Sequence, residues 1–127
     1  TARSDVPLSN FFVSQLINSA GFVDFDRVAN IFWMTKGQLA ETIGLTAPAV
    51  TKSDRQTAMR TQSRVREMLE IVARVRDWAG GDIQAMAWYR SQPIPALDGR
   101  TPEALVKAGQ ASSVRRYLDH LALGGFA

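Results

Sequence analysis

The residue types that carry most nucleophilic and metal chemistry are nearly missing from this sequence. It has no cysteine, and His120 is its single histidine. A cluster of His and Cys metal ligands is therefore excluded, and a Ser–His catalytic pair would have to be built around His120 alone. The sequence also has no glycine-rich phosphate loop. We therefore expect a protein that is not an enzyme and that needs neither a metal nor a cofactor.

The composition also predicts the cellular compartment of the protein. No segment approaches the roughly 20 consecutive apolar residues that cross a bilayer, and the first residues do not form an apolar signal peptide. The lack of cysteine agrees with a reducing compartment. We expect a soluble protein of the cytoplasm, with no membrane partner.

Basic residues are concentrated in the middle of the chain. Between Lys52 and Arg76, seven basic residues stand against three acidic ones, whereas the parts before and after are close to neutral. A local excess of this kind suits a polyanion such as DNA. A solvated helix face would give the same pattern, and charge alone does not separate the two interpretations.

The segment 38–52 has the spacing of a helix-turn-helix unit. Ala40 is small enough for two helices to approach closely, Gly44 permits a turn, and Val50 can anchor the second helix in a core. Such a unit can place its second helix in the major groove of DNA, but it can also be a purely structural hairpin. The second helix lacks the Arg, Asn and Gln side chains that usually read bases. Because the basic run follows directly, we favour DNA contact. The predicted DNA-binding residues are Thr46, Ala47, Ala49, Thr51, Lys52, Arg55 and Arg60.

The segment 88–109 combines aromatic and basic residues with a rigid loop. Trp88, Tyr89 and Arg90 end a helical pattern, a loop with two prolines follows, and Thr101 then caps a further helix. A preorganised loop loses little entropy on binding, and Trp, Tyr and Arg often anchor protein interfaces. Alternatively, such residues pack the domain's own core. We expect Trp88, Leu105 and Leu118 in the core, and Tyr89, Arg90 and Arg100 free for contact.

Apolar residues at helical spacing position these segments, and no strand pattern competes with them. Asp24 and Asp82 can cap helices, and Thr35 with Gln38 has the form of a capping box. The expected helices span 8–20, 25–34, 36–43, 47–52, 61–79, 83–91 and 102–108, and a last one ends at Gly124.

Motifs from residue 88 to the end of the chain carry a family resemblance. They are the pattern Trp-Tyr…Pro-x-x-x-Leu…Arg-Thr-Pro-x-x-Leu-Val…Gly, the stretch Val114-Arg115-Arg116-Tyr117-Leu118, and the ending Gly124-Gly125-Phe126. With the helix-turn-helix segment before them, in this order and length, they resemble the Xre/MbcA/ParS-type antitoxin family. The resemblance implies an all-α fold. Residues 1–79 would form an Xre-like helix-turn-helix bundle for DNA binding and dimerisation, and residues 80–127 a small helical toxin-binding domain.

The resemblance also implies a function. Members of this family are bacterial type II antitoxins that bind a RES-type toxin, which destroys NAD, and many repress their own operon. The C-terminal part would cover the toxin's active-site cleft, so the NAD chemistry would belong to the partner. We expect a homodimer, a hetero-oligomer with the toxin, and operator DNA as a further partner. The implied toxin-binding residues are Trp88, Tyr89, Arg90, Pro93, Leu97, Arg100, Thr101, Pro102, Leu105, Gly109 and Phe126.

A second hypothesis belongs to another class of protein. The chain could be a stand-alone helix-turn-helix transcriptional regulator, whose C-terminal part only dimerises or senses a ligand. DNA binding that needs no partner, and the absence of a neighbouring toxin gene, would favour that hypothesis.

Overall fold

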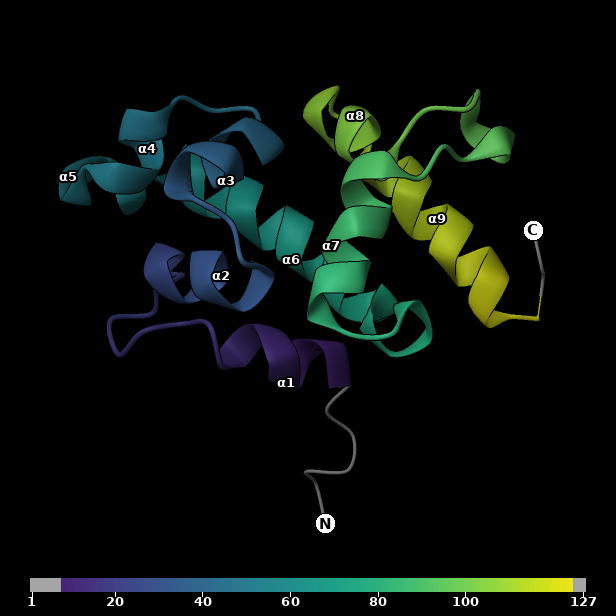
Figure 1. The fold of residues 1–127 in the computed structure, drawn as a ribbon, viewed down its shortest axis with the longest axis horizontal. Helices are drawn as coiled ribbons and strands as arrows, with labels where there is room; N and C mark the ends of the chain where they lie inside the picture. The colour runs from purple at the N-terminus through teal and green to yellow at the C-terminus, as the bar shows by residue number, and fades with distance from the viewer. Residues whose placement is uncertain (1–7, 125–127) are drawn as a thin grey trace, which may run out of the picture.

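The computed structural model describes residues 8–124, and helices make up most of them (Figure 1). Within this range the only strand-like pairings are two isolated antiparallel bridges, Ile17 with Val23 and Ile94 with Arg100. The predicted all-α class is therefore confirmed. The helices are α1 (Leu8–Ser14), α2 (Phe25–Phe32), α3 (Lys36–Thr42), α4 (Ala47–Thr51), α5 (Ser53–Gln56), α6 (Met59–Ala79), α7 (Asp82–Ser91), α8 (Pro102–Lys107) and α9 (Ala111–Ala122), with a 3₁₀ turn at Pro95–Leu97.

Among the described helices, none is long and apolar enough to span a bilayer.

Helix α6 is the longest helix and runs through the middle of the fold (Figure 1). Helices α1 and α5 from the N-terminal side and α7, α8 and α9 from the C-terminal side all pack against it. Six of its apolar residues are fully buried, and burying one large aliphatic side chain stabilises a fold by roughly 1.5–3 kcal/mol. The fully buried apolar residues of α6 are Val65, Met68, Leu69, Ile71, Val72 and Val75.

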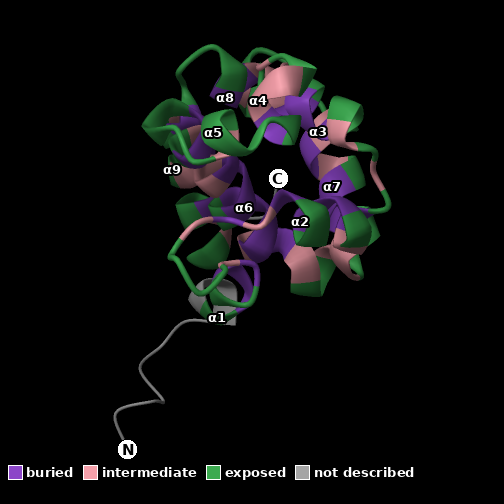
Figure 2. Cartoon of the chain, turned by 90° about the vertical axis from the view of Figure 1, so that its left-hand side faces the viewer, coloured by how far each residue is buried: buried purple, intermediate pink, exposed green. Residues whose placement is uncertain are grey.

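The core is continuous between the two halves of the chain. Buried side chains form one cluster from Phe12 in α1 to Leu118 in α9, and buried residues line the inner sides of the helices around α6 (Figure 2). The predicted domain boundary between residues 79 and 80 falls between α6 and α7. Helix α6 therefore lies in the predicted N-terminal domain, but it packs against helices of both predicted domains.

Three of the predicted helix starts are confirmed by their hydrogen bonds. The Asp24 carboxylate accepts from the backbone N–H groups of Asp26 and Arg27. Thr35 and Gln38 form both bonds of a capping box, and Thr101 Oγ1 accepts from the Ala104 N–H. Each such cap satisfies backbone donors that the first helical turn leaves without a partner, which typically stabilises by about 1 kcal/mol.

The first helix is shorter than its apolar spacing predicts. It ends at Ser14 instead of Ala20, because Asn18 Oδ1 accepts from the Ala20 and Phe22 N–H groups and holds a turn there. Asn competes in this way with helical hydrogen bonding. The Asp24 N–H then donates to the Leu16 carbonyl and closes the loop that leads into α2.

One further prediction on local structure is wrong. Asp82 does not cap α7: Gly81 occupies that position, and the Asp82 carboxylate pairs with the Arg76 guanidinium instead. The stretch between the predicted helices 47–52 and 61–79, for which no element is predicted, contains a further helix. Helix α4 ends at Thr51, the backbone of Lys52 is extended, and α5 occupies Ser53–Gln56. Thr46 precedes α4 but makes no side-chain capping bond.

Gly44 makes the turn between α3 and α4. Its φ of +74° lies in the left-handed region that side chains with a Cβ rarely adopt. The turn is also crowded, because a Cβ at this position would lie 3.0 Å from Arg64 Nη1. That guanidinium donates to the Ile43 carbonyl over 3.0 Å and so satisfies an acceptor at the end of α3. The turn therefore depends on both the glycine and the arginine from α6.

Replacing Gly44 by Ala is expected to lower the free energy of unfolding by about 1–2 kcal/mol, because alanine is strained at positive φ. Chemical denaturation monitored by circular dichroism measures the change. Gly37→Ala is the matched control: Gly37 lies in α3 without a positive φ, and a Cβ there would meet only Thr35 Oγ1, at 3.8 Å. The control should raise stability by about 0.5–1 kcal/mol. Equal effects of the two variants would contradict this account of the turn.

Candidate binding surfaces

Helices α3 and α4 form the two-helix arrangement that the segment 38–52 predicts. The Leu45 N–H donates to the Ala40 carbonyl and closes the turn over 2.9 Å. Ala40 is 1% exposed and Val50 is fully buried, so both serve the packing roles expected of them. The second helix is short, since α4 has five residues and the chain leaves helical geometry at Lys52.

The predicted DNA-binding residues all reach the surface around this unit. Ala49 is half-buried and the other six are exposed. Four of them (Thr46, Ala49, Arg55 and Arg60) line one open hollow of about 490 Å³ beside the turn. The structure therefore brings together the end of the turn, α4, α5 and the start of α6 on one surface, which we call the α4–α5 surface.

The basic run divides into two groups. Four of its seven residues serve the fold. Arg64 caps α3, Arg66 Nη2 donates to the Gly21 carbonyl over 2.9 Å, and Arg74 pairs with Asp119 over 2.9 Å. Arg76 pairs with Asp82 and lies over the Phe12 ring, 3.9 Å from its centroid. The remaining three are exposed and make no ion pair or side-chain hydrogen bond with any residue in 8–124. These three are Lys52, Arg55 and Arg60.

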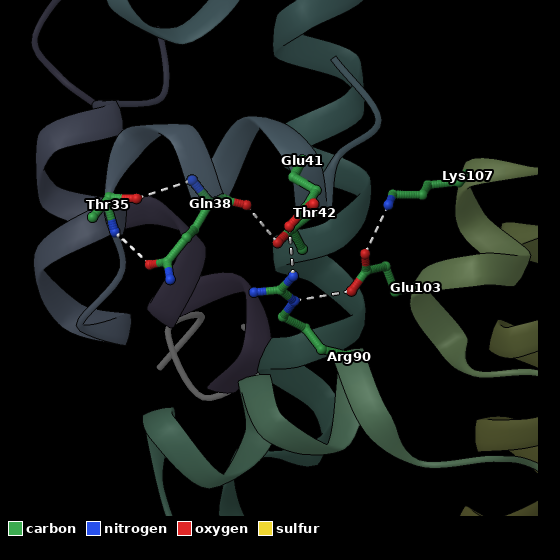
Figure 3. A network of polar contacts seen from close by, with 7 residues as sticks. All are labelled: Thr35, Gln38, Glu41, Thr42, Arg90, Glu103 and Lys107. Atoms are coloured by element: carbon green, nitrogen blue, oxygen red, sulfur yellow. Dashed lines mark hydrogen bonds and ion pairs between the residues drawn. The ribbon is translucent and has the colours of Figure 1, made fainter. Parts of the chain in front are cut away.

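A network of charges joins the two halves of the chain (Figure 3). The Glu103 side chain is only 12% exposed and accepts from Arg90 Nε over 3.0 Å and from Lys107 Nζ over 2.8 Å. Arg90 Nη2 also reaches Glu41 of α3, at 3.1 Å. A carboxylate this buried is tolerated because two cations compensate it. Arg90, predicted to be free for contact, is therefore tied to α3 and α8 by its own fold.

Tyr89 is buried more deeply than Trp88, which reverses the predicted order of the two side chains. Tyr89 is fully buried, on the same side of α7 as Ala85 and Met86, so the prediction that it is free for contact is wrong. Trp88 is half-buried at the edge of the core, where its ring meets the exposed Trp78 edge to face at 5.6 Å. Neighbouring residues of a helix point about 100° apart. Which of the two side chains is buried therefore depends on where α6 and α8 lie.

In its buried position the Tyr89 hydroxyl has no hydrogen-bond partner among residues 8–124. Burial raises its pKa well above the ordinary value, and the nearby carboxylates of Glu103 and Glu67 raise it further. The hydroxyl thus stays neutral and unpaired within the core.

The other implied toxin-binding residues divide between surface and interior. Leu105 and Pro102 are buried, and the expected core positions of Leu105 and Leu118 are confirmed. Thr101 is occupied as the cap of α8, and Arg100 Nη1 donates to Gln110 Oε1 over 3.1 Å while staying half-exposed. Pro93 and Gly109 are exposed and Leu97 is half-buried, whereas Phe126 lies outside the described residues.

The region that contains α7, α8 and α9 has a family assignment. Residues 74–124 match the family described as antitoxin Xre/MbcA/ParS C-terminal toxin-binding domain. This segment is therefore similar to the C-terminal toxin-binding domain of the antitoxin family that the motifs predict. The match begins within the last turns of α6, a few residues before the predicted domain boundary. Comparison with curated proteins and with solved structures gave no match.

Replacing Tyr89 by Phe is expected to raise the free energy of unfolding by about 1 kcal/mol, because it removes a buried hydroxyl that has no partner. Thermal unfolding followed by circular dichroism measures the change. Tyr117→Phe serves as the control, since Tyr117 is half-buried and its change should stay within about 0.5 kcal/mol. A marked loss of stability in Tyr89→Phe would mean that the hydroxyl has a partner after all.

Proposed function

We propose that this chain is the antitoxin of a type II toxin–antitoxin system, and that its partner is a RES-type, NAD-degrading toxin. The observation that carries the proposal is the match of residues 74–124 to a toxin-binding antitoxin domain. The RES type of the toxin follows from the motif resemblance between residue 88 and the end of the chain.

Inhibition would be steric. The C-terminal domain would cover the entrance to the toxin's active site, so that this chain need not supply any catalytic group. The rigidity of the segment around the proline loop supports such a role. The Ile94 N–H donates to the Arg100 carbonyl, the Gly99 N–H donates to the Ile94 carbonyl, and Ile94 is 1% exposed. A loop held in this way loses little conformational entropy when a partner binds.

Co-expression with the product of the adjacent reading frame tests the toxin assignment. We expect a stable complex on size-exclusion chromatography, growth arrest by the partner alone, and relief of that arrest by this chain. Cellular NAD should fall when the partner is expressed alone and recover on co-expression. A toxic partner that leaves NAD unchanged would contradict the RES assignment, and the lack of any complex would contradict the antitoxin role.

We also propose that the α4–α5 surface binds operator DNA as part of a homodimer and represses the operon. Lys52, Arg55 and Arg60 are the cations of the basic run that no described residue engages, and they cluster around the α3–α4 unit. Exposed cations of this kind bind phosphates and release counterions. A chain that binds DNA fully without any toxin, with no toxin gene beside it, would instead be the stand-alone regulator.

Replacing Lys52 or Arg55 by Ala is expected to weaken binding to a duplex of the chain's own promoter. Each variant should lower the slope of log affinity against log salt by about 1, because one phosphate contact is lost. Fluorescence anisotropy at several salt concentrations measures this. Arg74→Ala is the matched control from the same basic run, since Arg74 is paired with Asp119 inside the fold. An unchanged slope for both Lys52→Ala and Arg55→Ala would contradict the proposed surface.

A further inference from the structure

A small hollow lies between the proline loop and α9, and the function proposed above does not use it. It has a volume of about 300 Å³ and a mostly apolar wall. Ala96 and Leu97 come from the 3₁₀ turn of the loop, and the other lining residues come from α9. Those on α9 are Ser113, Arg116, Tyr117 and His120. We call this feature the α9 hollow.

The cation at the rim of the α9 hollow differs from its neighbours. Arg115 pairs with Glu67 and Glu70 of α6, and Asp119 is taken up by Arg74. Arg116 is exposed, and within residues 8–124 it has no acidic partner. His120 lies one helical turn further along α9 on the same side, also exposed and without an ion pair among these residues. Glu67, Glu70 and Asp119 are therefore used by other cations, while Arg116 is left beside an apolar surface.

We propose that the α9 hollow receives an apolar side chain of the toxin that is flanked by a carboxylate, with Arg116 pairing that carboxylate. The inference rests on the proposed function, because it takes the toxin as the occupant. Two observations support it. All six lining residues fall within the segment 74–124, which matches a toxin-binding domain. The combination of an apolar wall and an unpaired guanidinium is complementary to a partner that offers an apolar group beside an acid.

The position of Arg116 suits a role in binding the toxin better than a role in stabilising the fold. Because the guanidinium is exposed and unpaired, its removal costs the free chain little. In a complex, the apolar wall would exclude water from the ion pair and strengthen it. Leu97 is the one lining residue that the family resemblance also implies as a toxin contact, so the α9 hollow extends that surface onto α9.

The test measures the affinity of the full chain for a catalytically inactive variant of the toxin encoded in the adjacent reading frame, by isothermal titration calorimetry. Arg116→Glu is expected to weaken binding at least tenfold, because it places two like charges together. Arg27→Glu is the matched control. It makes the same charge change in α2, outside the matched segment, and removes only an exposed ion pair with Asp24 and a hydrogen bond to the Gln15 carbonyl, which contribute little to stability. The control should bind as the wild type does.

A second variant tests the hollow independently of charge. Ser113→Phe adds a ring on the side of α9 that lines the hollow, keeps Arg116 in place, and should also weaken binding at least tenfold by occupying the space. Thermal unfolding of each variant verifies that the fold is retained. Wild-type affinity in both Arg116→Glu and Ser113→Phe, with a normal wild-type complex, would overturn this inference and leave the proposed function standing. Loss of binding in Arg116→Glu alone would overturn the claim that the hollow is filled. Absence of a wild-type complex would overturn both proposals.

Discussion

The fold depends on one constraint, the burial of α6 on more than one side. Val65, Ile71 and Val72 are all fully buried although they do not lie on a single narrow stripe, so helices must cover this helix from several directions. Helices before and after α6 in the sequence meet this need together, and the result is one continuous core. The segment that matches the antitoxin domain starts inside α6. A toxin-binding region that shares its central helix with the α3–α4 unit is structurally coupled to it.

This packing also decides which charged side chains form ion pairs and which stay exposed. Once α7 and α8 are placed against α6, Glu103 lies in a site with little water, and Arg90 and Lys107 are drawn in to compensate it. The packing of α3, of the loop at Gly21, of α7 and of α9 around α6 likewise engages Arg64, Arg66, Arg74 and Arg76. Within residues 8–124, Lys52, Arg55 and Arg60 around α4 and α5, and Arg116 on α9, stay exposed and without an ion pair.

The geometry of the two proposed surfaces is compatible with two simultaneous partners. Helices α4 and α5 lie at one end of the long axis and α9 lies toward the other (Figure 1). A toxin bound at α9 would leave the α4–α5 surface accessible to DNA. The two surfaces are connected through α6, through the packing of α2 on α7, and through the ion pair of Arg90 with Glu41, which directly links α7 to α3. This arrangement fits a protein that both restrains a toxin and regulates its own promoter.

The sequence by itself determined the all-α class, the caps at Asp24, Thr35 and Thr101, and the likeness of residues 74–124 to an antitoxin domain. These features are local, because helical periodicity, capping bonds and family motifs depend on residues close together in the chain. Only the tertiary structure decided that Tyr89 is buried while Trp88 lies at the edge, and which arginines of the basic run stay exposed. Those outcomes depend on contacts between residues far apart in sequence, such as Arg74 with Asp119 and Arg90 with Glu41. Local spacing can place a side chain on a face of its helix, but the partner that covers that face comes from elsewhere in the chain.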